Sequence, residues 1–122
     1  MDQQYEDNIV QARLLRYKEG LGKFKQSMPA LVDQYHAFTE SCFAEGHLKQ
    51  KQKHLIALGI SMYAQDDDCI IYHTKGCLDR GCTHEEILET IGVTTAIGGG
   101  TVMSRGVTLI QQCLDEFTKQ TH

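Results

Sequence analysis

The sequence has no tryptophan, a single proline (Pro29) and no apolar run approaching the roughly 20 residues of a membrane-spanning helix. The first twenty residues carry charges throughout, so they lack the apolar core of a signal peptide. Basic residues form no block, and no zinc-finger spacing or aromatic stacking pattern appears. We therefore expect a cytoplasmic protein that binds neither membrane nor nucleic acid.

Cysteine pairs of the C-x-x-C type are also missing. The five cysteines are an odd number and lie at Cys42, Cys69, Cys77, Cys82 and Cys113. In a reducing compartment we expect most of these thiols to be free and buried, because free cysteine packs as a small hydrophobe. One reactive cysteine among the five is the ordinary expectation.

The bulk composition is that of a folded chain. Hydrophobic residues make up 41% and charged residues 23% of the 122 residues, and the formal net charge is -4. This length and composition predict one domain over residues 1–122 with a modest core. No repeat, low-complexity tract or interdomain linker interrupts it.

Hydrophobic spacing favours an all-α fold of five to six helices, because few segments alternate with period two. The expected helices cover about residues 5–18, 29–46, 49–64, 66–79, 83–97 and 101–119. Gly20 and Gly22 are expected to end the first helix, and Pro29 to begin the second. The glycines at 98–100 are expected to interrupt the helix, and two interpretations explain them. They either allow two helices to approach closely or form a phosphate-binding loop. The second interpretation is weaker, because no strand precedes them and no Gly-Lys-Ser/Thr follows.

Two helix starts carry capping residues. Thr83 and Glu86 have the spacing of a capping box, in which each side chain accepts a hydrogen bond from the other residue's N–H. Asp66 is placed to cap the next helix by accepting the N–H of Cys69. A capping role for Asp66 does not prevent its carboxylate from orienting a neighbouring thiol.

One helical face gathers chemically active side chains. Cys69 and His73 are four residues apart and share a face with Asp66, three residues before Cys69. An imidazole can generate a thiolate, and a first-turn position favours one through the helix dipole. Asp67 and Asp68 oppose this effect, since negative charge disfavours a thiolate. The alternative is a buried packing cysteine.

Other roles for these residues remain open. His54, at the polar edge of an apolar helix, is by itself most simply a solvent-facing or capped imidazole. Together with Asp66, Cys69 and His73 it could supply four zinc ligands, but nothing else fixes that spacing, so we expect no metal and no cofactor. Cys77 or Cys82 could resolve an oxidised Cys69, although neither spacing predicts a disulfide.

Four blocks in order, at residues 48–61, 68–74, 81–91 and 97–100, resemble the carboxymuconolactone decarboxylase family, in particular its AhpD-like (alkylhydroperoxidase-like) branch. The resemblance covers about residues 46–103. It implies an all-α domain that assembles as a homo-oligomer, commonly a trimer or hexamer, with active sites near subunit contacts. It also implies a hydroperoxide or disulfide substrate and a thiol reductant.

The family's site residues transfer in part. The AhpD-like pattern is a glutamate, then Cys-x-x-Cys-x-x-x-His on the next helix. Cys69 matches the second cysteine and His73 the histidine, whereas Asp66 replaces the first cysteine and His54 the glutamate. The two-cysteine cycle is therefore excluded, and we expect a one-cysteine cycle in which Cys69 reacts, Asp66 remains an acceptor, and His73 and His54 manage protons.

Two alternatives follow from the changed positions. A decarboxylase-like lyase would use acid–base groups on a γ-lactone acid, with Arg80 or Arg105 as the cation for its carboxylate. A non-enzymatic oligomeric binding protein would show no unusual thiol reactivity.

Overall fold

The computed structural model describes the backbone of residues 2–119 and the side chains of residues 9–119. Within residues 2–119 the chain contains helices and no strand, so the all-α prediction is confirmed. The elements are α1 (Asp2–Ser27), α2 (Pro29–Phe43), α3 (Gln50–Tyr63), α4 (Asp67–Asp79), α5 (His84–Gly98), α6 (Gly100–Arg105), the π-helical turn η1 (Gly106–Ile110) and α7 (Gln111–Lys119). None of the described helices has the length and apolar composition to cross a bilayer.

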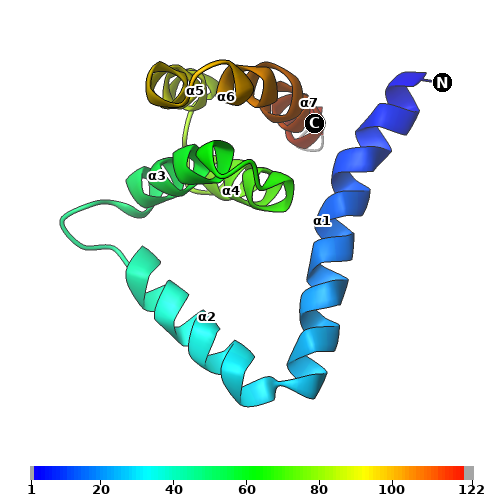
Figure 1. Ribbon diagram of the computed structural model, residues 1–122, viewed down its shortest axis with the longest axis vertical. Helices are drawn as coiled ribbons and strands as arrows, with labels where there is room; N and C mark the ends of the chain where they lie inside the picture. The colour runs from blue at the N-terminus through cyan, green and yellow to red at the C-terminus, as the bar shows by residue number, and fades with distance from the viewer. Residues whose placement is uncertain (1, 120–122) are drawn as a thin grey trace.

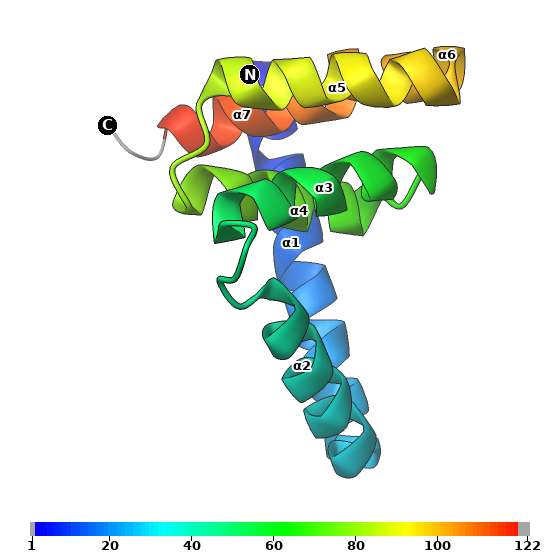
Figure 2. The ribbon, with the colours of Figure 1, turned by 90° about the vertical axis from the view of Figure 1, so that its left-hand side faces the viewer.

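Two layers of helices form the body of the protein, and a helical arm projects from it (Figures 1 and 2). Helices α3 and α4 pack side by side in one layer. Helices α5, α6 and α7 form the other layer, which lies over the first. The arm, residues 16–43, comprises the second half of α1 and all of α2. The loop after α2 brings the chain back to the body at α3.

Helix α1 is longer than predicted, because it continues through Gly20 and Gly22 to Ser27. Glycine costs about 1 kcal/mol relative to alanine inside a helix, which lowers stability without forcing the helix to stop. The helix instead ends where Pro29 restricts the preceding residue. Pro29 begins α2 in the first turn, as predicted.

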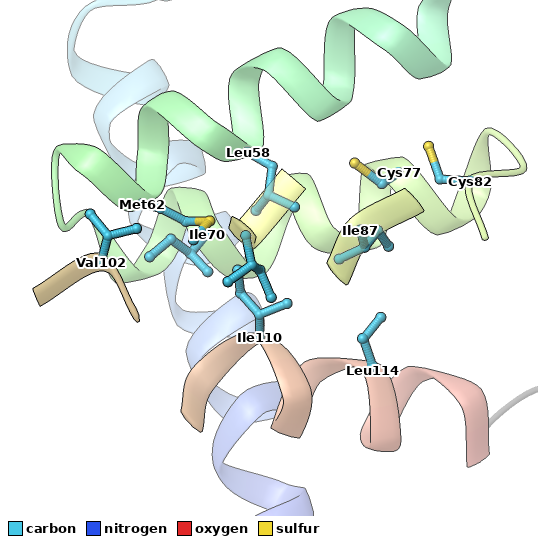
Figure 3. Packing of buried hydrophobic residues seen from close by; sticks show 10 residues of the cluster. Leu58, Met62, Ile70, Cys77, Cys82, Ile87, Val102, Ile110 and Leu114 are labelled. Atoms are coloured by element: carbon cyan, nitrogen blue, oxygen red, sulfur yellow. The ribbon is translucent and has the colours of Figure 1, made fainter. Parts of the chain in front are cut away.

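The main core lies between the two layers (Figure 3). Side chains of α3 and α4 meet those of α5, α6 and α7 there, and the buried set is Leu58, Met62, Ile70, Cys77, Cys82, Ile87, Ile91, Val102, Ile110 and Leu114. Burying each large aliphatic side chain contributes roughly 1.5–3 kcal/mol of transfer free energy. This core fixes α3 against α4 and thereby positions the candidate site.

A second buried cluster attaches the first half of α1 to the body. Val10 and Leu14 of α1 pack with Ile71 of α4 and with Cys113 and Phe117 of α7. Beyond this cluster the arm has little support, since α2 buries a single residue, Val32. The arm is therefore held at its two ends rather than along its length.

The predicted capping box is present at the start of α5. The Thr83 hydroxyl accepts the Glu86 N–H at 3.1 Å, and the Glu86 carboxylate accepts the Thr83 N–H at 2.8 Å. Gly81, with φ of 85°, follows the end of α4, where the left-handed backbone favours glycine.

The three glycines lie at the end of α5 and the start of α6, and Gly98 allows the close packing that one of the two interpretations predicted. A Cβ on Gly98 would lie 2.5 Å from a Val102 methyl carbon, so a larger residue would collide with α6. Gly99 has φ of 82°, a conformation that favours glycine. The π-helical turn that follows was not predicted.

Candidate functional site

His54 lies on α3, and the other three predicted site residues lie on the first half of α4 and at its N-cap. Asp66 is the N-cap of α4, and its carboxylate accepts the Cys69 N–H at 3.2 Å, which confirms the predicted cap. Gln65, immediately before it, has a left-handed φ of 57°, which an L-residue adopts only with some strain. This tight turn brings His54 of α3 next to His73 of α4.

Cys69 is partly exposed and is held as a thiol. Burial is the main cause that raises its pKa to about 11, and a hydrogen bond to Asp66 together with the charges of Asp66 and Asp68 raises it further. The first-turn position of Cys69 therefore does not produce a thiolate at neutral pH. Burial, the Asp66 hydrogen bond and the charges of Asp66 and Asp68 together outweigh the helix dipole. Of the two residues expected to oppose a thiolate, Asp68 is among these causes and Asp67 is not.

The other two acidic residues of this turn are paired with arginines. Asp67 forms ion pairs with Arg105 and, at 3.5 Å, with Arg13. Asp68 pairs with Arg13 at 3.2 Å. These pairs connect α4 to α1 and α6, and they leave Asp66 as the acid hydrogen-bonded to Cys69. Arg105, one of two arginines considered for a substrate carboxylate, is thus already engaged.

His54 is buried rather than solvent-facing, which corrects the simplest interpretation of this residue alone. Its side chain is 7% exposed, and burial followed by the charge of Arg80 lowers its pKa to about 4. The Nδ1 atom is buried without a hydrogen-bond partner. It lies against Gly76 of α4, where an added Cβ would be only 2.7 Å away. His54 is therefore a neutral imidazole at physiological pH.

The two imidazoles belong to one aromatic cluster. The His54 and His73 ring centroids are 5.7 Å apart, and Phe43 of α2 lies 4.8 Å from the first and stacks on the second at 5.8 Å. Tyr72 meets His73 edge-on at 5.2 Å. Burial lowers the pKa of His73 as well, and its Nδ1 is also buried and unpartnered. Both rings can accept a proton at neutral pH.

Several residues of the site were not predicted from the sequence. Phe43 arrives from α2, and Tyr17 of α1 lies near the thiol, since the charged form of Cys69 contributes to the raised pKa of Tyr17. The Tyr17 and Tyr72 ring centroids are 6.3 Å apart. Gly76 could have been found from the sequence, because it lies three residues after His73 and therefore on the same face of the helix as the site. Phe43 and Tyr17 carried none, since only the tertiary fold brings them here.

The remaining cysteines are separated from Cys69. Cys77 lies eight residues further along α4, a rise of about 12 Å, which is too far for a disulfide without unfolding. Cys82 is buried beside Cys77 (Figure 3), and Cys113 is buried under α1. Neither Cys77 nor Cys82 is thus placed to resolve an oxidised Cys69. Cys42 on α2 is the exposed cysteine.

The zinc alternative receives no support from the geometry. Among the described residues, no group of three or more His, Cys, Asp and Glu side chains is arranged to hold a metal ion. The inward contact of the His54 Nδ1 with Gly76 directs this nitrogen toward the α4 backbone instead of toward Cys69. The arrangement offers a thiol at Cys69, the imidazole of His73 one helical turn later, and a second imidazole, His54, next to His73.

The depressed pKa of His54 predicts acid destabilisation. The folded chain keeps this imidazole neutral down to about pH 4, whereas the unfolded chain takes up a proton near 6.5. Its stabilising contribution is therefore complete above pH 6.5 and is lost as pH falls toward 4. We expect the urea midpoint to decrease between pH 7 and pH 4.5, with a smaller decrease in a His54→Gln variant. Equal decreases in both proteins would show that His54 does not cause the acid destabilisation.

Comparison with known proteins identifies the family to which this fold belongs. A model of the carboxymuconolactone decarboxylase family matches residues 29–112, and the chain belongs to this family. An uncharacterized protein encoded in the cox locus of Paracoccus denitrificans is 32% identical over 80 residues, covering 66% of this chain and 72% of that protein. An uncharacterized Cupriavidus necator protein is 26% identical over 91 residues, covering 75% and 80%.

Solved structures agree with the assignment. A carboxymuconolactone decarboxylase family protein from Legionella pneumophila, in its apo form, has a TM-score of 0.82 and 26% identity, covering 92% of this chain and 96% of its own. A Thermotoga maritima family member has a TM-score of 0.73 and 25% identity, covering 88% and 94%. A role in the antioxidative response has been suggested for the Thermotoga protein, which is consistent with the AhpD-like branch.

Proposed function

We propose that this family member is a thiol-dependent antioxidant protein that reduces hydroperoxides through a single cysteine, Cys69. The observation that supports this proposal is the placement of a partly exposed thiol one helical turn before a neutral imidazole, His73. A second neutral imidazole, His54, lies 5.7 Å from His73 between ring centroids. Cysteine supplies the nucleophile, and the imidazoles supply proton acceptors.

The cycle has three steps. His73 accepts the thiol proton as the Cys69 sulfur attacks the terminal, hydroxyl-bearing oxygen of the hydroperoxide, so that an S–O bond forms and the O–O bond breaks. The leaving alkoxide takes up the proton and departs as an alcohol, and Cys69 becomes a sulfenic acid. A small-molecule thiol then forms a mixed disulfide with Cys69 and releases water. A second thiol displaces the protein thiol and leaves as the oxidised disulfide.

General-base assistance is necessary in this scheme. With a pKa of about 11, Cys69 carries roughly one thiolate in ten thousand at pH 7. The pre-formed thiolate is therefore scarce, and the proposed scheme has proton transfer to His73 accompany the attack. The scheme predicts turnover that needs His73 and is slow compared with a thiolate-based peroxidase.

Mapping the oxidation sites tests this proposal. The reduced protein is treated with equimolar cumene hydroperoxide in the presence of dimedone, and each cysteine is quantified by mass spectrometry. We expect the sulfenic-acid adduct to form at Cys69 faster than at Cys42, although Cys42 is the more exposed thiol. Exposure alone would give the opposite order, so Cys42 is an internal control.

Two variants complete the test. Cys69→Ser is expected to abolish peroxide turnover with dithiothreitol as reductant, whereas Cys42→Ser retains it. Oxidation spread evenly over the exposed thiols, or turnover that survives Cys69→Ser, would contradict a redox role for Cys69.

The high pKa of Cys69 also favours a second candidate, an acid–base lyase that does not use the thiol. Its proton acceptors are the neutral imidazoles of His54 and His73, and Arg80 is close enough to influence the His54 pKa. Arg80 would then meet the carboxylate of a γ-lactone acid. Decarboxylation of such a lactone that survives Cys69→Ser and is lost in His54→Gln would favour this candidate over the first.

A further inference from the structure

A cleft of about 680 Å³ lies between α1 and the start of α4, next to the candidate site. Asp68, immediately before Cys69, forms its α4 side. The α1 side is a single helical face with the i, i+3, i+4 and i+7 spacing, and its residues are Arg13, Arg16, Tyr17, Gly20 and Leu21. Small-molecule sites measure roughly 300–1,000 Å³, so this cleft has the size to hold one. We call it the α1–α4 cleft.

Arg16 is the cation of this cleft that is available to a ligand. Arg13 is already paired with Asp68 at 3.2 Å and with Asp67 at 3.5 Å. Arg16 lies three residues further along the same face, and within residues 9–119 it forms no ion pair or hydrogen bond. The lining carries two guanidinium groups and one carboxylate, so it favours an anion. A guanidinium binds a planar carboxylate through two parallel hydrogen bonds.

Tyr17 supplies a second donor and connects the cleft to the thiol. Burial, followed by the charge of Cys69, raises the pKa of Tyr17, so its hydroxyl stays protonated and can donate a hydrogen bond. Within the described part of the chain this hydroxyl has no hydrogen-bond partner. The influence of the Cys69 charge on Tyr17 means that the two side chains are neighbours. A ligand held by Arg16 and Tyr17 therefore lies beside Cys69.

The one-cysteine cycle requires a thiol that enters from outside. Asp66 stands where the family pattern has another cysteine, and neither Cys77 nor Cys82 is placed to pair with Cys69. A sulfenic acid at Cys69 must therefore be reduced by a second molecule that reaches it. An unpaired guanidinium and a phenol beside the thiol favour a reductant that carries a carboxylate.

We propose that the α1–α4 cleft binds a small carboxylate-bearing thiol, which is the reductant of Cys69. This assignment rests on the function proposed above and names the class of its second substrate. Arg16 pairs with the carboxylate and Tyr17 donates to it, so both are positioning residues. The thiol sulfur of the ligand attacks the sulfenic sulfur of Cys69, an S–S bond forms and the S–O bond breaks. The departing hydroxide takes the thiol proton and leaves as water.

Thiol–disulfide exchange tests this site without any peroxide. Methyl methanethiosulfonate converts Cys69 to its methyl disulfide, N-acetylcysteine or its uncharged amide then removes the methylthio group, and mass spectrometry follows each cysteine. We expect Arg16→Gln to slow the exchange with N-acetylcysteine at Cys69 about threefold and to leave exchange with the amide unchanged. Both thiols should keep their wild-type rates at Cys42, which is the internal control.

The control for charge is Lys18→Gln. Lys18 is two residues from Arg16 and lines a different hollow of α1, so this variant removes the same charge outside the cleft. We expect it to leave the exchange of both thiols at Cys69 at the wild-type rate. A loss as large as that of Arg16→Gln would mean that the net charge of α1, rather than a site, attracts the carboxylate.

Filling the cleft gives an independent test. Gly20 lines the cleft and Gly22 does not, and at both positions an added Cβ would meet nothing within 4 Å. Leucine favours a helix more than glycine does, so Gly20→Leu and Gly22→Leu should both fold with an undiminished urea midpoint. We expect Gly20→Leu to slow exchange with N-acetylcysteine at Cys69 at least threefold and Gly22→Leu to leave it unchanged.

Two results would overturn the proposal. One is an exchange rate with N-acetylcysteine that neither Arg16→Gln nor Gly20→Leu changes. The other is an Arg16 effect confined to oxidation, in which the variant slows linoleic acid hydroperoxide relative to cumene hydroperoxide but not the thiols. The carboxylate would then belong to the oxidant. Because exchange needs no peroxide, the expected exchange rates in a protein without peroxide turnover would refute the peroxidase cycle and retain the carboxylate–thiol site.

Discussion

Replacing Asp66 by asparagine is expected to make Cys69 more reactive at pH 8. The carboxylate raises the thiol pKa through its hydrogen bond and its charge, and asparagine removes the charge. Each unit of decrease in the pKa gives about ten times more thiolate, partly offset by lower nucleophilicity, so the net gain is roughly fourfold per unit. The rate of iodoacetamide alkylation at Cys69, followed from pH 7 to pH 11, measures both the rate and the pKa.

Asparagine is the informative substitution because it caps helices as well as aspartate does. The cap on the Cys69 N–H therefore remains, and stability should hardly change. Asp66→Ala removes the same charge and the cap, at a cost of about 1 kcal/mol, and so separates the two roles. Asp79→Asn, at the far end of α4, is the matched control. An alkylation profile that Asp66→Asn leaves unchanged would show that burial alone sets the thiol pKa.

Introducing a methyl group at Gly76 is expected to disturb both stability and the site. Its Cβ would lie 2.7 Å from the His54 Nδ1 and 2.9 Å from Cε1, closer than such atoms approach. The imidazole is packed against Phe43 and cannot retreat without moving it. Overpacking of this kind costs about 1–3 kcal/mol and exceeds the roughly 1 kcal/mol that alanine gains over glycine in a helix. We expect a lower urea midpoint for Gly76→Ala.

A second background makes this prediction specific. In a His54→Ala variant the obstructing ring is gone, so Gly76→Ala should become stabilising by about 1 kcal/mol through helix propensity alone. The change of sign between the two backgrounds measures the contact directly. Equal effects in both backgrounds would mean that Gly76 is required for a reason other than His54.

Helix positions were predictable wherever the sequence contains a local signal. Pro29, the capping box at Thr83 and the cap at Asp66 each depend on residues a few positions apart, and all three were located. The exception was α1, because a glycine weakens a helix without specifying an end. Gly20 and Gly22 therefore gave a misleading signal.

The residues of the candidate site could be named from the sequence, whereas their environment could not. Spacing along α4 placed Cys69 and His73 on one face, and the family resemblance drew attention to His54. Burial of His54, its contact with Gly76 and the stacking of Phe43 depend on how α2, α3 and α4 pack together. No local pattern encodes such contacts, and these contacts decide the protonation of the imidazoles.

The π-helical turn at Gly106–Ile110 has a consequence for how this chain tolerates changes in length. A π turn holds one residue more than the regular helix on either side of it. Deleting a residue there would convert it to an ordinary helical turn and leave the inward faces of α6 and α7 aligned. A deletion elsewhere in α7 would rotate the side chains beyond it by about 100° and turn Phe117 out of its cluster. Length variation among relatives is therefore expected to concentrate at this turn.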